Sequence, residues 1–153
     1  MKPVALIDLD NCISDDRWRW PMFDLHLPIV NERYQRYHAA CEADLHDNSH
    51  VIQRLRYRYD LIVATSRPES VRHKTQLWLR KWNIPTKRIF MRPDDNHQPS
   101  PTLKAWMLDQ AREEGFNVHY AIDDRADILD MYADEGVRIC RRVFINNIEN
   151  IHP

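Results

Sequence analysis

The sequence predicts an α/β protein: a doubly wound parallel sheet with a small helical cap inserted after its first strand. Short aliphatic runs alternate with amphipathic segments of helical period through most of the chain. One long departure from this alternation, residues 12–47, follows the first aliphatic run. Charged residues gather where aliphatic runs end, and sheets of this class carry their sites at the carboxyl ends of strands. These three observations predict the fold class.

Five segments have the composition of strands. A strand of a parallel sheet is covered by helices on both faces, so it appears as a continuous apolar run rather than an alternating one. The last of the five segments is less apolar than the others, and we expect it at an edge of the sheet. The segments are residues 4–9, 60–65, 88–91, 118–122 and 137–144.

Helices are predicted between these strands, and particular residues set their ends. Ser49 can cap a helix that runs to Arg58. Pro85 is expected to stop the helix that starts near Pro68, because a proline disfavours helical geometry in the residue before it. Glycines close the last two helices. The predicted helices are residues 29–43, 49–58, 68–82, 102–114 (closed by Gly115) and 126–135 (closed by Gly136).

Length and composition bound the class of protein. We expect the 153 residues to form a single domain, 1–153, with residues 12–47 as the cap insert. A formal net charge of -1 disfavours extended duplex binding by charge alone. Two glycines exclude a glycine-rich phosphate loop. Three cysteines without a C-x-x-C spacing predict reduced thiols and a cytoplasmic location, and no apolar run is long enough for a membrane span.

Polar residues with complementary chemistry follow three of the predicted strands. Because the carboxyl ends of parallel strands meet at one edge of the sheet, these side chains are expected to converge. Several carboxylates brought together repel one another, and a divalent cation relieves the repulsion. Oxygen ligands without His or Cys nearby favour Mg²⁺ over zinc. The residues are Asp8 and Asp10 after the first strand, Thr65, Ser66 and Arg67 after the second, Lys104 near the start of the next-to-last helix, and Asp123, Asp124 and Arg125 after the fourth strand.

This set of residue types suits phosphoryl transfer. Strand alternation places Asp8 and Asp10 on one side and Leu9 on the other. One carboxylate can attack phosphorus while the other handles the proton of the leaving group. A hydroxyl and a lysine complete a cradle for the transferring group. The pattern therefore predicts covalent phosphoryl transfer through an aspartyl phosphate.

The ordered set resembles the haloacid dehalogenase (HAD) phosphohydrolase superfamily. Its pattern is an apolar strand and D-x-D, an apolar strand and Ser or Thr, a lysine, and an apolar strand and D-D. The matching stretches, in that order, are residues 7–10, 63–65, Lys104 and residues 121–124. Asn11 and Cys12 stand where Gly and Thr are usual, and Asn can adopt the backbone angles of Gly at some cost.

The resemblance implies a role for each matching residue. Asp8 would be the nucleophile and Asp10 the general acid/base. Thr65 and Lys104 would hold the phosphate. Mg²⁺ would be held by Asp8, the backbone carbonyl of Asp10, and Asp123, with Asp124 in support.

Within the superfamily the chain is most similar to the 3'-phosphatase domain of bacteriophage polynucleotide kinases. Residues 64–68, 72–79, 90–93 and 121–125 carry this similarity. It implies that the substrate is a phosphate ester on a nucleotide or on a nucleic-acid 3' end.

Five residues are candidates for substrate binding, and each has a structural alternative. In the insert, Arg17, Trp18, Arg19 and Trp20 follow one another, and Arg17 and Trp18 are the candidates taken from this run. An aromatic ring of the run could stack on a base while an arginine meets a phosphate, or the side chains could pack within the cap. Ser66 is expected to lie beside the phosphate. Arg67 and Arg125 could bind phosphate or pair with the acidic residues.

Two other functions remain open at this point. The same residues would serve a 5'-(deoxy)nucleotidase that acts on mononucleotides. A phospho-accepting or binding module without turnover uses a similar acidic sheet edge. Such modules place an acidic pair after the first strand and a lone Asp after a later one, whereas here D-x-D comes first and D-D last, which disfavours them.

Overall fold

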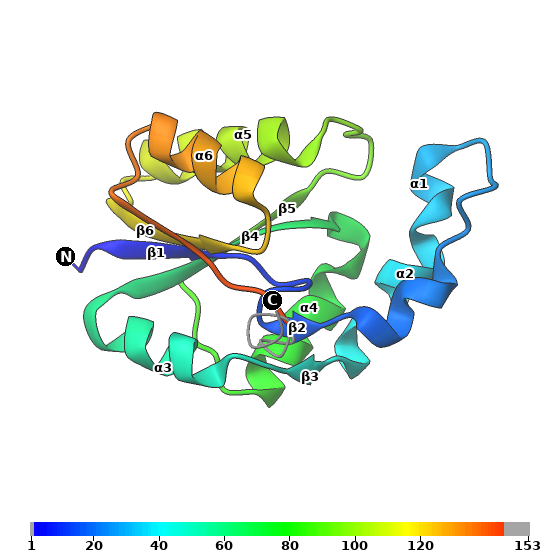
Figure 1. The fold of residues 1–153 in the computed structure, drawn as a ribbon, viewed down its shortest axis with the longest axis horizontal. Helices are drawn as coiled ribbons and strands as arrows, with labels where there is room; N and C mark the ends of the chain where they lie inside the picture. Colours follow the sequence, from blue (N-terminus) through cyan, green and yellow to red (C-terminus); the bar gives the residue numbers. More distant parts are fainter. Residues whose placement is uncertain (1, 146–153) are drawn as a thin grey trace, which may run out of the picture.

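A five-stranded, fully parallel sheet forms the centre of the protein, as predicted. The computed structural model describes residues 2–145 (Figure 1). The strand order is β5-β4-β1-β6-β7. Strand order reverses between β1 and β6, which is where a sheet of this kind opens a crevice. The strands are β1 (Val4–Ile7), β4 (Asp60–Pro68), β5 (Arg88–Arg92), β6 (Val118–Asp123) and β7 (Ile139–Arg142), with β7 at an edge as expected.

Helices cover both faces of the sheet (Figure 1). Successive residues of β1 point to opposite faces: Ala5 and Ile7 belong to one buried cluster, Val4 and Leu6 to the other. Burial on both faces explains the continuous apolar composition of this strand. The helices are α3 (Ser49–Arg58) and α4 (Arg72–Lys81) on the first face, and α5 (Ser100–Glu113) and α6 (Ala126–Asp134) on the second.

The segment between β1 and α3 forms a separate small structure. An antiparallel ribbon of β2 (Ser14–Asp15) and β3 (Leu45–His46) joins it to the sheet. Between these strands the chain makes short helices, of which α1 and α2 project to one side of the sheet (Figure 1). We call residues 17–43 the helical insert. Its elements are the 3₁₀ helix η1 (Arg17–Met22), α1 (Val30–Arg33), α2 (Gln35–Ala39) and the 3₁₀ helix η2 (Cys41–Ala43).

The single helix predicted over residues 29–43 is broken into three pieces. The breaks fall at Tyr34 and Ala40. In α2 only Tyr37 is buried, so the segment has no continuous apolar face that could hold one long helix against the rest of the protein.

Two helix ends differ from the prediction because asparagines in the left-handed conformation set them. Asn48, with φ of 52°, precedes α3, and Ser49 is the first helical residue rather than the cap. The Asn48 side chain donates to the carbonyls of Cys12 and Phe144. Asn83, with φ of 55°, turns the chain after α4, so that helix ends before Pro85 can act.

Other predictions about the chain hold in the structure. Gly115 and Gly136, both at positive φ, close α5 and α6. Cys12, Cys41 and Cys140 are free thiols. Among the helices of residues 2–145, none is both long and apolar enough to span a membrane.

Candidate active site

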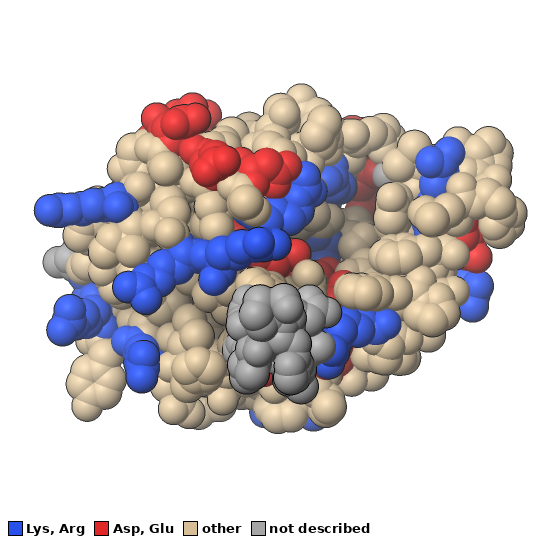
Figure 2. All heavy atoms as spheres, in the orientation of Figure 1, with Lys and Arg blue, Asp and Glu red and all other residues tan. Residues whose placement is uncertain are grey.

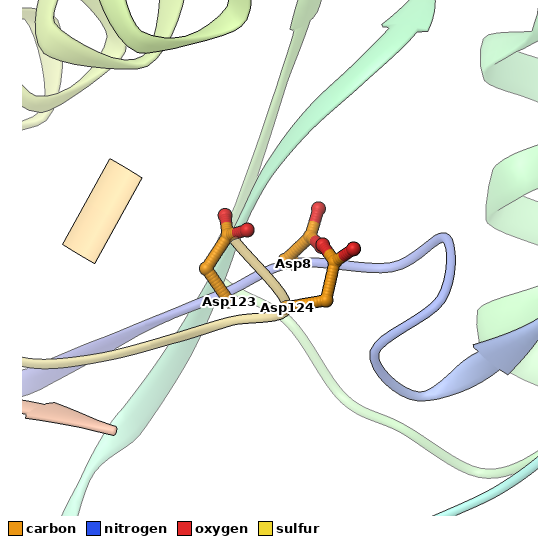
Figure 3. A group of neighbouring side chains, drawn as sticks. All are labelled: Asp8, Asp123 and Asp124. Atoms are coloured by element: carbon orange, nitrogen blue, oxygen red, sulfur yellow. The ribbon is translucent and has the colours of Figure 1, made fainter. Parts of the chain in front are cut away.

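Three carboxylates converge at the edge of the sheet where β1 and β6 end (Figure 3). Asp8 follows β1, Asp123 ends β6, and Asp124 comes next. One oxygen of each lies within 4.8 Å of the others. The parallel register, with Ile7 opposite Ile122, brings the three residues level, and the Asp8 amide donates to the Ile122 carbonyl at 3.2 Å. The structure therefore brings together three of the predicted metal ligands.

Lys104 of α5 lies against two of these carboxylates. Its Nζ donates to Asp8 Oδ1 at 2.8 Å and to Asp123 Oδ2 at 2.5 Å, and the side chain is buried. Burial and the charge of Asp123 raise the pKa of Asp8 well above its usual range. Burial acts to lower the pKa of Lys104, but the negative charges of Asp123 and Asp8 outweigh it and raise that pKa.

The charges of this cluster fit a divalent cation. If all three carboxylates are ionised, the single ammonium group leaves two negative charges uncompensated in a largely buried place, a cost that a bound cation removes. Carboxylate oxygens are the ligands that Mg²⁺ prefers in proteins. Within residues 2–145 this is the one group of three or more metal-ligating side chains with such spacing.

Asp10 lies outside the carboxylate cluster and is held by two buried arginines. Its Oδ1 accepts from Arg67 Nη2 at 2.7 Å and Nε at 3.0 Å, and from Arg19 Nη2 at 2.9 Å. Although burial acts in the opposite direction, the charges of Arg67 and Arg19 hold the pKa of Asp10 below its usual range. Of the two alternatives for Arg67, the structure thus shows ion pairing with a carboxylate of the site.

Arg19, for which the sequence left phosphate binding and packing within the cap as alternatives, pairs with carboxylates instead. It lies in η1 and is completely buried. Its guanidinium donates to both oxygens of Asp44, at 2.7 and 2.6 Å, and to the Tyr37 carbonyl at 2.9 Å. Arg19 therefore joins the helical insert to Asp10. In the run Arg-Trp-Arg-Trp, nothing in the sequence distinguishes this buried arginine from its exposed neighbour Arg17.

Asp44 is the centre of this buried polar network. Besides Arg19 it accepts from Ser14 Oγ at 2.6 Å and from the indole N–H of Trp18 at 2.8 Å. Arg67 Nη2 lies 3.6 Å from Asp44 Oδ2. The backbone carbonyl of Asp44 accepts a hydrogen bond from the indole N–H of Trp78. The network fixes both ends of the helical insert to the loop that carries Asp10.

The predicted phosphate-binding hydroxyls lie at the end of β4, next to β1. Thr65 is buried, and its Oγ1 accepts from the backbone amide of Arg67 at 3.2 Å. Ser66 Oγ is 2.8 Å from the hydroxyl of Ser100, which begins α5. Both residues therefore reach the same edge of the sheet as Asp8.

A groove with a volume of about 530 Å³ opens beside Asp124. Asn11 lies in it with φ of 59°, which confirms that an asparagine here takes the backbone conformation of glycine, and its Nδ2 donates to Asp124 Oδ2 at 3.0 Å. Arg17 and Arg125, both predicted for substrate binding, line the groove; the latter pairs with Asp127. Trp20, from the same run as Arg17, also lines the groove, whereas the sequence gave no indication of Arg142.

Trp18 is not brought to this groove. Its indole N–H points to Asp44, and its ring lines a second depression together with Asp15, Arg17, Ala43 and Leu45. A base-stacking role for Trp18 stays a prediction.

His38 of α2 gives the protein an expected pH dependence of stability. Within the described residues its buried Nδ1 has no hydrogen-bond partner, and burial lowers its pKa to about 4. An unfolded chain binds a proton to this ring below about pH 6.5, whereas the folded chain does so only near the lower value. Stability should therefore fall as the pH drops through this window, by at most about 3 kcal/mol from this residue.

Urea unfolding at about pH 8 and about pH 5, for wild type and His38→Gln, measures this contribution. We expect the variant to lose less stability on acidification than wild type. Equal losses in the two proteins would show that His38 is not the source.

Comparisons with known proteins show the family and the fold of this chain. The family model of the polynucleotide kinase PNKP phosphatase domain matches residues 4–144. One chain in the "Structure of Pnkp1/Rnl/Hen1 complex" superposes with a TM-score of 0.75 and 21% identity, over 94% of this chain and 45% of that chain. A chain of the Pnkp1/Rnl/Hen1 RNA repair complex gives 0.67 and 21%, over 93% and 42%. This chain thus spans less than half the length of either.

A third similar structure belongs to the wider superfamily. It is a putative HAD-hydrolase from Bacillus subtilis bound to magnesium, with a TM-score of 0.62 and 16% identity over 98% of each chain. No curated protein sequence matches the chain. The structures show the fold, and the family model covers nearly all of it. The chain therefore belongs to the phosphatase domain family of polynucleotide kinase within the HAD superfamily of phosphatases.

Proposed function

We propose that this protein is a Mg²⁺-dependent phosphatase that removes the 3'-phosphate from nucleic-acid ends or nucleotides, with Asp8 as the nucleophile. The observation that carries the proposal is the contact of Lys104 with both Asp8 and Asp123, beside Asp124. This contact supports the proposal, because a carboxylate that could act as nucleophile, a positive charge and oxygens that could bind a metal lie together. The Pnkp1 complexes among the similar structures, one of them an RNA repair complex, support a nucleic-acid substrate.

In this proposal an oxygen of Asp8 attacks the phosphorus of the ester. A bond forms between phosphorus and the carboxylate, and the bond to the leaving 3'-oxygen breaks. Water then attacks the phosphorus of the aspartyl phosphate, which releases inorganic phosphate and restores the carboxylate. Lys104, held at 2.8 Å from Asp8, would balance the charge of the phosphoryl oxygens together with the hydroxyl of Thr65.

Asp10 would transfer the protons of both steps. Arg67 and Arg19 favour the ionised form of Asp10 in the free protein, so it would take up a proton from solvent when the negatively charged substrate binds. It would then give this proton to the leaving 3'-oxygen and take one back from the attacking water. Arg19 and Arg67 fix the position of its carboxylate through three hydrogen bonds. Asp8, Asp123, Asp124 and the backbone carbonyl of Asp10 would hold Mg²⁺, whose positive charge stabilises the phosphoryl oxygens when the ion is bound.

Phosphate release measured over a panel of substrates tests this proposal. The panel contains a 3'-phosphorylated single-stranded oligonucleotide, 3'- and 5'-mononucleotides and a sugar phosphate, each with Mg²⁺ and with excess EDTA. We expect release from the 3'-phosphates in Mg²⁺ and none in EDTA. Preference for 5'-mononucleotides would favour the nucleotidase alternative. The absence of release from every substrate would overturn the proposal and favour a phospho-accepting module.

A further inference from the structure

We infer that Tyr37 of α2 is a positioning residue for the general acid/base Asp10, and that it acts through Arg19. The inference rests on the proposed function, since Asp10 transfers protons only in that reaction. It adds to that proposal a residue of the helical insert that does not touch the reacting atoms. The ring face and the backbone carbonyl of Tyr37 contact the guanidinium that donates to Asp10 Oδ1 at 2.9 Å.

Tyr37 restrains the Arg19 guanidinium in two ways. The guanidinium carbon lies over the tyrosine ring, 4.2 Å from its centroid, which is the geometry of a cation–π contact. Arg19 Nη1 donates to the Tyr37 carbonyl at 2.9 Å. Both residues are buried, so water does not compete for either contact. The stacked ring therefore resists tilting of the guanidinium out of its plane, and the hydrogen bond resists rotation within that plane.

The hydroxyl of Tyr37 fixes the ring in turn. It donates to Oδ2 of the buried Asp16, which also accepts from the indole N–H of Trp20 at 3.1 Å. Burial raises the pKa of Tyr37, so the hydroxyl keeps its proton and can donate it to this bond. The Asp16 carbonyl accepts from the Arg19 amide at 2.9 Å. This bond closes a loop of contacts that runs from Arg19 through Tyr37 and Asp16 back to Arg19.

Asp16 makes the tyrosine contact at a cost in stability. Its Oδ1 is buried and has no hydrogen-bond partner among residues 2–145. A buried carboxylate oxygen without a partner is unfavourable, because nothing replaces the water that it loses on folding. Departures from the rules of stable packing are expected mainly at functional sites. The cost therefore supports a role for the contact between Asp16 and Tyr37 beyond packing of the insert.

The position of Arg19 affects which oxygen of Asp10 is free. Arg19 and Arg67 both donate to Oδ1, and no residue in the described part of the chain donates to Oδ2. The Asp10 side chain is 19% exposed. Oδ2 is thus the oxygen that can exchange a proton with a leaving group or with water. Movement of Arg19 would release one of the two residues that hold the carboxylate in this orientation.

The other contacts of Arg19 do not replace the tyrosine ring. Asp44 accepts from Nε and Nη2, which are bonds directed along the plane of the guanidinium and not across it. Figure 2 shows a hollow between the helical insert and the sheet, so the insert does not pack against the sheet along this side. Contacts within the insert, with Tyr37 among them, must therefore keep Arg19 directed at Asp10.

The dependence of the rate on the leaving group tests the inference. A general acid accelerates departure of an alkoxide, whereas p-nitrophenolate is stable without a proton and gains little from one. We would measure kcat/KM for the best substrate of the panel above and for p-nitrophenyl phosphate in wild type, Tyr37→Leu, Tyr37→Phe and Tyr34→Phe. This quantity covers the steps up to release of the leaving group, and the ratio of the two values cancels any loss of active protein.

Tyr34→Phe is the matched control, because it removes a tyrosine hydroxyl from the same insert. The Tyr34 ring packs edge-on against Phe23, with 5.4 Å between centroids, and not on Arg19. We expect the ratio of the panel substrate to p-nitrophenyl phosphate to fall about tenfold in Tyr37→Leu and about threefold in Tyr37→Phe, which keeps the ring. The control should have the wild-type ratio.

Two results would overturn the inference while the proposed function stands. One is a wild-type ratio in Tyr37→Phe and in Tyr37→Leu. The other is an equal loss of kcat/KM on both substrates, which is the signature of a merely structural role. If Tyr37→Leu does not fold, Tyr37→Phe alone decides between these outcomes and the expected one.

Hydrogen exchange at the Arg19 Nε–H, followed by NMR, tests the contact without turnover. It therefore remains informative if no substrate is hydrolysed and the proposed function fails. Arg19→Lys assigns the resonance, and the Nε–H of the buried Arg67 is an internal reference. We expect several-fold faster exchange at Arg19 in Tyr37→Leu than in wild type, with little change at Arg67. Unchanged exchange at Arg19, or equal acceleration at both arginines, would contradict the inference.

Discussion

Replacement of Asp8 with Asn is expected to lower kcat for release of a 3'-phosphate at least about a thousandfold, because it removes the nucleophile. Asn has nearly the shape of Asp and still offers an oxygen to Lys104. Burial and the charge of Asp123 raise the pKa of Asp8, so its ionised carboxylate destabilises the folded state in the absence of a cation. The variant should therefore unfold at the wild-type temperature or above it while it loses activity.

Phosphate release and thermal unfolding, measured on the same preparation, test this prediction. Asp109→Asn is the control, since Asp109 is exposed on the helix that carries Lys104. It should leave both quantities unchanged. An Asp8→Asn protein that retains more than about a tenth of wild-type kcat would show that Asp8 is not the nucleophile.

Replacement of Asp44 with Ala is expected to lower the free energy of unfolding by about 3–5 kcal/mol. The side chain is completely buried and accepts from Arg19, Ser14 and Trp18. Its loss leaves the buried guanidinium of Arg19 with Asp10 as its remaining carboxylate partner. Removal of one member of a buried ion pair is costly because the other charge stays desolvated.

Urea unfolding measures this loss, and a surface pair provides the control. Asp24 pairs with Arg36 at 3.2 Å, and the arginine side chain is 66% exposed. Asp24→Ala should cost less than about 1 kcal/mol, since exposed pairs contribute little. If Asp44→Ala were as stable as Asp24→Ala, the network would not hold the helical insert in place.

The sequence was sufficient to predict the sheet and the carboxylate cluster for the same physical reason. Strands buried on both faces must be apolar, and the residues that follow them meet at one edge of the sheet. Once the strands are recognised, the convergence of Asp8 and Asp123 follows from topology. Lys104 is assigned to the same site because it is the third of four motifs that occur in the order of the HAD pattern. No detail of side-chain packing is needed for this inference.

Pairing of Arg67 with an acidic residue was one of two alternatives from the sequence, but the rest of the network around Asp10 could not be predicted, because Arg19 and Asp44 lie in segments without long regular elements. Arg19 lies in the 3₁₀ helix η1 at the start of the helical insert, and Asp44, 25 positions later, directly follows its end. The periodicity of the insert is weak, so the sequence gives no register that would bring them together. The groove posed the same difficulty, since Trp20 and Arg142 come from distant parts of the chain.

Helix ends were missed where asparagine adopts left-handed backbone angles. Asn48 turns the chain before α3, where Ser49 was expected to be the cap. Asn83 turns the chain after α4, where Pro85 was expected to end the helix. An asparagine tolerates positive φ but does not require it, so its presence in a sequence does not fix the boundary. At Asn48 the backbone conformation is stabilised by hydrogen bonds from its side chain to the carbonyls of Cys12 and Phe144, which lie far away in the sequence.

Chemical trapping of the covalent intermediate tests the central claim most directly. The protein would be mixed with a 3'-phosphorylated single-stranded oligonucleotide and Mg²⁺, quenched, and treated with borohydride, which reduces an aspartyl phosphate to homoserine. Peptide mass spectrometry then locates the modified residue. The proposed function predicts homoserine at position 8 in wild type, and none when substrate is omitted. Homoserine at another aspartate, or steady phosphate release by Asp8→Asn at the wild-type rate, would contradict it.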